Sequence, residues 1–336
     1  AGALHVDISG LKKERTSVII FATLGVLIST FLVGTGLYYL VQLLGFESIP
    51  YLHCLLFGAL ISPTDPIAVL GILKTTNINE SLQLKIEGES LFNDGIGVVV
   101  FSAILIFAEM GDMMAETEHL VAEVLTLFGE EVFLGLALGL VLGWVGYRLM
   151  KSCESDPYLS SILTLAVVFG GYSLAAVLHT SGPLAMVVAG LYIGNKIKTS
   201  DFNDKTEDQL DGFWYILDES LNGVLFVFMG LGIHLINIEN SKLLLLTGIS
   251  IILVLLARFI SVWLPYSLIK HAESSWSKTT YILTWGGLKG GISIALALSL
   301  APEFSKDKIL LLTYGTVIFS ILIQGLTISK LVKKLY

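Results

Sequence analysis

The residues best suited to chemistry in this sequence are acids and hydroxyls that interrupt otherwise apolar segments. Residues 87–98 read EGESLFNDGIGV. On a helix, Ser90 and Asp94 lie four residues apart and share one face, while Glu89 and Asn93 share the adjoining face. Desolvation favours the neutral form of a buried carboxylate, so Asp94 could exchange a proton near neutral pH.

A second apolar segment, residues 58–70, contains a pattern that breaks helices. It reads GALISPTDPIAVL, in which Pro63 and Pro66 flank Thr64 and Asp65. Each proline removes a backbone donor, so we expect the backbone to be unwound here, with carbonyl groups free to face a cation or another partner.

These two segments together could build an ion site. Asp94, Asp65, Ser90 and Thr64 offer an all-oxygen cage, which suits a hard cation such as Na⁺ better than zinc or copper, because those metals prefer nitrogen or sulfur ligands. One carboxylate can hold a proton or a metal ion, but it cannot hold both. The residues therefore predict a site at which a cation and a proton compete.

Two basic residues lie inside apolar segments and need compensation. Arg258, in LLARFISV, requires an acidic partner, and Glu89 is the best candidate for what we interpret mainly as a structural ion pair. Lys289 lies among four glycines in WGGLKGGI, a poor continuous helix. Its ammonium could offset the partial negative charge of helix carbonyl ends, or it could act in transport, and the sequence leaves both roles open.

The composition indicates that these residues lie in a membrane protein. The chain has 336 residues, of which 54% are hydrophobic and only 14% are charged. Its mean hydropathy is +0.80, and soluble domains carry about 25% charged residues. The net charge of −8 excludes a basic surface for nucleic acid. Cys54 and Cys153 are too far apart in sequence to indicate a disulfide framework or a metal site.

Ten apolar runs predict an all-α membrane protein, a helical bundle with about ten transmembrane helices. The sixth run is short for a span. Most Lys and Arg residues fall in alternate loops, and the positive-inside rule places those loops and the C-terminus in the cytoplasm. The runs lie near residues 16–44, 51–73, 87–108, 124–147, 158–178, 183–195, 213–235, 243–269, 279–300 and 309–329.

The second and ninth runs, which contain the two breaks, are seven crossings apart and therefore traverse the membrane in opposite directions. Paired interrupted helices in oppositely oriented halves are typical of transporters with inverted repeats and a site near the midplane. The charged residue in each break favours this interpretation over a pair of simple kinks.

Three motifs resemble those of the monovalent cation:proton antiporters, in particular the sodium/proton exchanger branch with its NhaP-like prokaryotic members. They are FGALISPTDPIAVL at 57–70, GESLFNDGIGVVVF at 88–101 and GGLKGGISIALAL at 286–298. The resemblance implies thirteen helices with two crossed discontinuous helices, of which this chain would hold the last ten. It also implies a homodimer, an ion-binding core from residues 16–108 and 243–329, and a scaffold from residues 124–235.

By the same resemblance, Asp94 would carry the cation and the proton in turn, with Asp65, Ser90 and Thr64 as further ligands, and Glu89 would be linked to Arg258. Asn93 stands where the electrogenic branch has a second aspartate, which implies electroneutral exchange of one Na⁺ or Li⁺ for one H⁺. Lys289 replaces an arginine that many members carry. We expect no cofactor beyond the transported ions, and the inner membrane of a prokaryote as the location.

Two other functions are compatible with buried acids. An intramembrane aspartyl protease could use Asp65 and Asp94 as a catalytic pair, although the residues around them do not form a protease signature. A passive cation channel is poorly separated from an antiporter by sequence.

Overall fold

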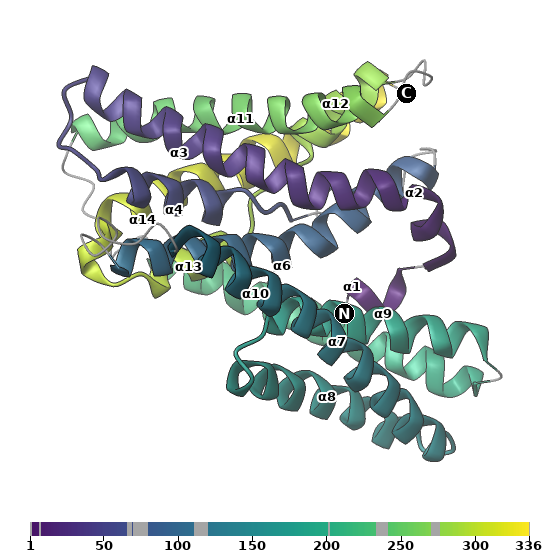
Figure 1. Ribbon diagram of the computed structural model, residues 1–336. Helices are drawn as coiled ribbons and strands as arrows, with labels where there is room; N and C mark the ends of the chain where they lie inside the picture. Colours follow the sequence, from purple (N-terminus) through teal and green to yellow (C-terminus); the bar gives the residue numbers. More distant parts are fainter. Residues whose placement is uncertain are drawn as a thin grey trace. The chain divides into compact units, whose positions relative to one another are not determined.

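The computed structural model shows a chain built from helices (Figure 1). It describes residues 2–6, 8–65, 69, 80–110, 120–200, 202–232, 241–269 and 276–335. Within these ranges the β-type pairing is a single isolated bridge between Asp65 and Leu288, and no sheet is formed. The predicted all-helical fold is confirmed.

The chain divides into two compact units, which are described separately. One comprises Ala1–Lys13 and Thr117–Val227, and the other comprises Glu14–Glu116 and Phe228–Tyr336. Helices α2 and α10 each contribute residues to both units. In chain order the elements are α1 (Gly2–His5), α2 (Ile8–Ile20), η1 (Phe21–Gly25), α3 (Val26–Leu43), α4 (Tyr51–Ile61), α6 (Glu80–Met110), α7 (Leu120–Ser152), α8 (Pro157–Val177), α9 (Gly182–Thr199), α10 (Asp204–Gly232), α11 (Ser241–Ile269), α12 (Trp276–Trp285), α13 (Gly291–Ser299), η4 (Pro302–Phe304), α14 (Lys306–Phe319), η5 (Ser320–Gly325) and α15 (Leu326–Leu335).

Seven helical stretches among the described residues are long and apolar enough to cross a membrane. The other three predicted runs contain the shorter helices α4, α9, α12 and α13, so the count of ten crossings stays a prediction. The seven are Gly10–Leu43, Ser81–Glu109, Gly129–Ser152, Pro157–Val177, Asp204–Gly232, Lys242–Ser267 and Lys306–Leu335.

The first unit is packed through small residues on neighbouring helices. Helix α7 presents a glycine every four residues, which lets the α9 backbone approach closely, as is common between membrane helices. Helix α8 begins at a favourable cap, because the Asp156 side chain accepts hydrogen bonds from two backbone amides. The α7 glycines are Gly135, Gly139 and Gly143, and they face the α9 cap residue Ser181 and the α9 residues Ala185 and Ala189.

In the second unit, α3 packs against both α4 and α11 (Figure 1). The contact with α4 is close enough to require glycine, because a Cβ atom on Gly58 would collide with the Thr30 carbonyl oxygen. Gly36 of α3 similarly faces Leu253 of α11, where an added Cβ would lie 2.6 Å from a side-chain methyl group. These contacts fix α4 beside α3 and α3 beside α11. The end of α4 leads into the first break.

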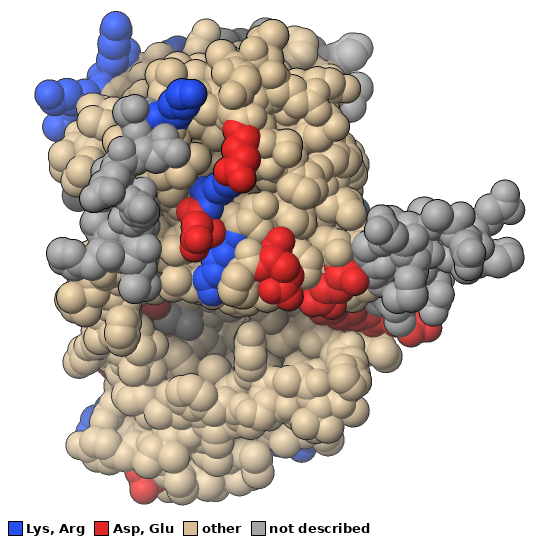
Figure 2. All heavy atoms as spheres, turned by 90° about the vertical axis from the view of Figure 1, so that its left-hand side faces the viewer, with Lys and Arg blue, Asp and Glu red and all other residues tan. Residues whose placement is uncertain are grey.

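Acidic and basic side chains gather on the side of the second unit where α13 meets α14, on an otherwise largely uncharged surface (Figure 2). Lys308 of α14 lies 2.8 Å from Glu47 of the loop before α4. The hydrogen bond from this ammonium lowers the pKa of the exposed Glu47 carboxyl. Such pairs suit the polar end of a membrane-embedded bundle, where water is available.

Candidate cation-binding site

Two unwound segments, one after α4 and one between α12 and α13, meet in the second unit. Helix α4 ends at Ile61, just before Pro63, and α12 ends at Trp285, before the glycine-rich segment that leads into α13. The Asp65 amide donates a hydrogen bond of 2.8 Å to the Leu288 carbonyl, which joins the two unwound segments as a short antiparallel bridge. Pro66, the second predicted helix breaker, lies outside the described residues.

Helix α6 holds the first break through Thr64. Asn93 Nδ2 donates to Thr64 Oγ1 at 2.8 Å, and the Thr64 amide donates to Asn93 Oδ1 at 3.4 Å. Ser90 Oγ donates to the Thr64 carbonyl. All three residues are buried. The predicted ligands Ser90 and Thr64 are therefore in contact. Asn93 holds the first break against α6 through its two hydrogen bonds to Thr64.

The two aspartates of the predicted cage lie at the same place and keep partial exposure. Asp65 and Lys289 are the charged side chains that act on the Asp94 carboxylate. Asp65 packs against the second break, since a Cβ atom on Gly290 would lie 2.6 Å from Asp65 Oδ2. The half-buried setting of both acids contrasts with Glu89, which is 2% exposed. Asp94 and Asp65 are thus the site acids that keep some exposed surface.

The structure pairs Glu89 with Arg258, the partner favoured from the sequence. Their side chains meet at 2.5 Å between Arg258 Nη1 and Glu89 Oε1, and both are buried. Arg258 also donates to the Leu283 carbonyl from Nε at 3.3 Å and from Nη2 at 3.1 Å. This arginine therefore links α11 to α6 and to the last turn of α12.

The Lys289 side chain lies at the carbonyl end of α4. Its ammonium donates to the Ser62 carbonyl at 3.0 Å and to the Pro63 carbonyl at 3.2 Å. These carbonyls lie at the partially negative end of a short helix, where a cation is favourable. The contacts support the charge-compensating role, one of the two that the sequence left open.

Comparison with known proteins identifies the family. The sequence profile of the family described as "Sodium/hydrogen exchanger, transmembrane" matches residues 1–334. The chain belongs to this sodium/hydrogen exchanger family. It is similar to the Na(+)/H(+) antiporter NhaP of Pseudomonas aeruginosa, with 44% identity over 343 residues that cover 100% of this chain and 78% of that protein. It is also 34% identical to the antiporter NhaH of Halobacillus aidingensis, over 99% of this chain and 79% of that protein.

The fold of the exchanger is similar to a solved structure, that of the sodium proton antiporter MjNhaP1 from Methanocaldococcus jannaschii at pH 8. The TM-score is 0.77 at 23% identity, and the match covers 99% of this chain and 82% of the other. The resemblance based on three motifs is confirmed. The protein is a multi-pass membrane protein of a transporter family, and it is not an enzyme.

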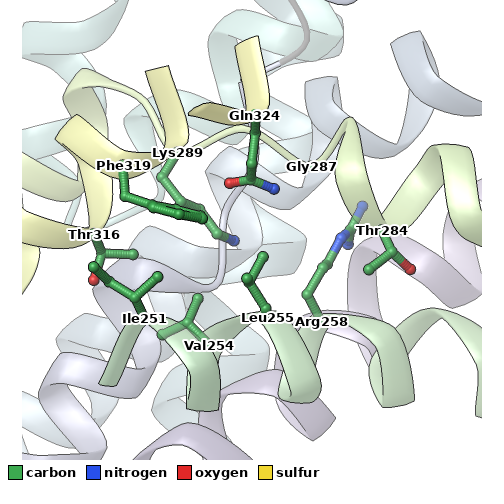
Figure 3. A pocket seen from close by; sticks show the side chains of 10 residues that line it. All are labelled: Ile251, Val254, Leu255, Arg258, Thr284, Gly287, Lys289, Thr316, Phe319 and Gln324. Atoms are coloured by element: carbon green, nitrogen blue, oxygen red, sulfur yellow. The ribbon is translucent and has the colours of Figure 1, made fainter. Parts of the chain in front are cut away.

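Sequence reasoning missed two residues of the exchanger that hold the second break. Ser320 Oγ accepts a hydrogen bond of 2.9 Å from the Lys289 amide, and Gln324 Nε2 donates to the Trp285 carbonyl at 3.1 Å. Gln324 also lines a cavity with Arg258 and Lys289 (Figure 3). The signal was present, because polar residues four apart interrupt the tenth run in the same way as Ser90 and Asp94 interrupt the third.

Gly290 gives a direct test of how closely the two breaks must approach. We expect Gly290→Ala to raise the apparent KM for Na⁺ by about 10-fold to 100-fold, because the new Cβ atom must displace the Asp65 carboxylate. The backbone at this residue has φ −115°, which alanine adopts without strain. Cation titration of transport in proteoliposomes measures the effect. Gly325→Ala is the matched control, since its Cβ atom would meet no atom closer than 3.7 Å. Equal KM values for the two variants would contradict the proposed position of Asp65.

Proposed function

We propose that this exchanger moves one Na⁺ or Li⁺ against one H⁺, with Asp94 as the shared carrier. The observation that carries the proposal is a cluster of five ionisable side chains, counted here in their ordinary charged forms. Its acids are Asp94, Asp65 and Glu89, and its bases are Arg258 and Lys289. With all five ionised, the cluster has one negative charge in excess. A single positive charge balances it, and either a metal ion or a proton can supply that charge.

The surrounding ligands favour a hard cation over a softer metal. Asp94 and Asp65 supply carboxylate oxygens, and Thr64 and Ser90 supply hydroxyl or carbonyl oxygens beside them. Oxygen ligands of this kind suit Na⁺ and Li⁺. Binding of the cation requires the ionised form of Asp94, and protonation removes it, so the two occupants exclude each other. This competition couples the uptake of one to the release of the other.

The larger architecture follows the same proposal. The unit that contains α4, α6, α11, α12 and α13 carries the ion, and the other unit serves as the scaffold through which two copies associate as a homodimer. The ten predicted crossings belong to a thirteen-helix fold with inverted repeats, in which the two interrupted helices are counterparts. The protein resides in the inner membrane of a prokaryote, with its C-terminus in the cytoplasm.

The decisive experiment is cation-induced dissipation of a preset pH gradient in proteoliposomes. Addition of Na⁺ or Li⁺ to vesicles with an acidic lumen should release protons from the lumen, and K⁺ serves as the comparison cation. Empty liposomes and liposomes with heat-unfolded protein provide the background. If neither Na⁺ nor Li⁺ accelerates proton release above this background, exchange is not the activity of the protein.

The one-for-one stoichiometry predicts that transport does not depend on the membrane potential. A cycle that moved one net charge would be biased by about 2.3 kcal/mol for each 100 mV. We therefore expect the initial rate of Na⁺-driven proton release to change by less than about twofold when a potential of either sign is imposed. For a cycle that moves one net charge, the same 100 mV would bias the exchange by more than about tenfold. A steep dependence on potential would count against electroneutral exchange.

The two alternative functions give different results. The similar proteins are transporters, which argues against an intramembrane aspartyl protease that uses Asp65 and Asp94. A passive cation channel would show single-channel currents in planar bilayers and would not drive protons against their gradient. We expect neither behaviour.

A further inference from the structure

Each unwound segment is held by two polar side chains of a neighbouring helical segment. On α6, Ser90 and Asn93 bond to Thr64 of the first break. In η5, between α14 and α15, Ser320 and Gln324 bond to the two ends of the second break. Ser320 has no exposed surface and Gln324 is 3% exposed. The second pair has no place in the proposed ion cage, so it needs its own explanation.

The second break needs external support because its backbone has few partners of its own. Between α12 and α13 the internal bonds run from the Gly286 amide to the Ile282 carbonyl at 2.7 Å and from the Leu288 amide to the Gly286 carbonyl at 2.8 Å. Glycine-rich backbone can adopt many conformations. A backbone carbonyl without a hydrogen bond is also strongly unfavourable in a membrane interior. The bonds to Lys289 and Trp285 meet both needs, because they satisfy backbone groups and select one conformation.

The local helix geometry directs both side chains to the break. Residues Ser320–Gly325 form a π-helical turn between α14 and α15. Such turns occur often at functional sites, because the wider turn alters which side chains face inward. Leu322 and Ile323 of the same turn are exposed. The turn therefore places its two polar side chains inside and its apolar side chains outside.

Movement of the second break would be transmitted to the ion cage by two contacts. The Leu288 carbonyl accepts the bond from the Asp65 amide, and the Lys289 ammonium bonds to the Ser62 and Pro63 carbonyls just before Thr64. Figure 3 shows the Gln324 and Lys289 side chains extending into the same cavity. Displacement of residues 285–289 would therefore shift the backbone that carries both Thr64 and Asp65.

We propose that Ser320 and Gln324 are positioning residues that set the affinity for the transported cation by fixing the second break against the first. They act through the break and do not touch the ion. This inference rests on the proposed function, since it assumes that Asp65 and Thr64 bind the cation. It adds a determinant of affinity outside the cage itself.

Two variants test the proposal by separating KM from maximal rate. Ser320→Ala removes the acceptor for the Lys289 amide, and Gln324→Met removes the amide donor at similar size. Each should raise the apparent KM for Na⁺ about fivefold, the factor that one ordinary hydrogen bond supplies, while the maximal rate per folded protein changes less than twofold. Ser320→Thr keeps the acceptor and should restore a low KM. Thr313→Val is the control, because its buried hydroxyl donates within its own helix to the Ile309 carbonyl.

A binding measurement without transport completes the test. Na⁺ should raise the thermal unfolding temperature of the purified wild type, and the half-saturating concentration should increase in the variants by the same factor as the KM. An unchanged KM and an unchanged half-saturating Na⁺ concentration in both variants would overturn the positioning role. The role would also be overturned if the variants yielded less folded protein but that folded protein bound Na⁺ with the affinity of the wild type. If Gln324→Met does not fold, Ser320→Ala decides, because it removes one oxygen atom. A wild type that binds Na⁺ but moves no protons would instead overturn the proposed function.

Discussion

Asp94→Asn should reduce Na⁺-driven proton release in proteoliposomes to the background of empty vesicles. Asparagine has nearly the same size and polarity as aspartate, but it cannot ionise. The variant loses the negative charge that attracts the cation and the titrating group that carries the proton, so both halves of the exchange are lost. With Asp65 and Glu89 against Arg258 and Lys289, the cluster becomes neutral. A neutral cluster has no excess charge for either occupant to balance.

Folding of the Asp94→Asn variant should be unaffected or slightly favoured, because a partly buried charge is replaced by a neutral amide. The thermal unfolding temperature in detergent measures this, and the shift on addition of Na⁺ should disappear. Asp218→Asn is the matched control, since Asp218 is an exposed acid on α10 whose carboxylate accepts from Asn222. Its exchange rate should equal that of the wild type. Retained exchange in Asp94→Asn would refute the carrier role.

The neighbouring residues Asn93 and Asp94 show how much the sequence could predict. Their place in an apolar run indicated functional polar residues, and helical spacing correctly put Ser90 near the break. The sequence could not show that the Asn93 amide bonds Thr64 through both its nitrogen and its oxygen. That contact depends on how α6 packs beside α4, which is a property of the tertiary structure. An amide at position 93 therefore has a structural role, since it both donates to and accepts from Thr64, in addition to lacking the charge of an aspartate.

The sequence predicted that the helix is broken around Lys289, but it did not predict which residues bond to this break. Four glycines around Lys289 indicated an interrupted helix, and the cost of a buried arginine indicated an acid partner for Arg258. The bridge between Asp65 and Leu288 and the bonds to Ser320 and Gln324 join segments more than 30 residues apart. Helical periodicity contains no information about such pairs. The π-helical turn at Ser320–Gly325 likewise does not follow from the helical periodicity of the tenth run.

Glu89→Gln should both destabilise the protein and weaken cation binding. The substitution leaves the buried Arg258 guanidinium without its negatively charged partner, so that neutral oxygens, the Leu283 carbonyl and the new amide, are its acceptors. Removal of one partner of a buried ion pair typically costs about 3–5 kcal/mol. The cluster also becomes neutral, so the attraction for a cation falls as it does in Asp94→Asn. We expect a clear decrease in thermal unfolding temperature and at least a tenfold higher apparent KM for Na⁺ in the fraction that folds.

The double variant separates charge from contact. Arg258→Gln alone leaves Glu89 unpaired and should destabilise the protein to a similar extent. In Glu89→Gln/Arg258→Gln, Asp94 and Asp65 face Lys289 alone, so the single excess negative charge returns. The double variant should therefore be more stable than either single variant and should recover an apparent KM near that of the wild type, with incomplete recovery of stability because the Leu283 carbonyl loses its donor. A double variant that recovers stability while its KM for Na⁺ stays high would give the opposite conclusion. The pair would then set the cation affinity through the geometry that it imposes, and the charge balance of the cluster would not determine the one-for-one exchange.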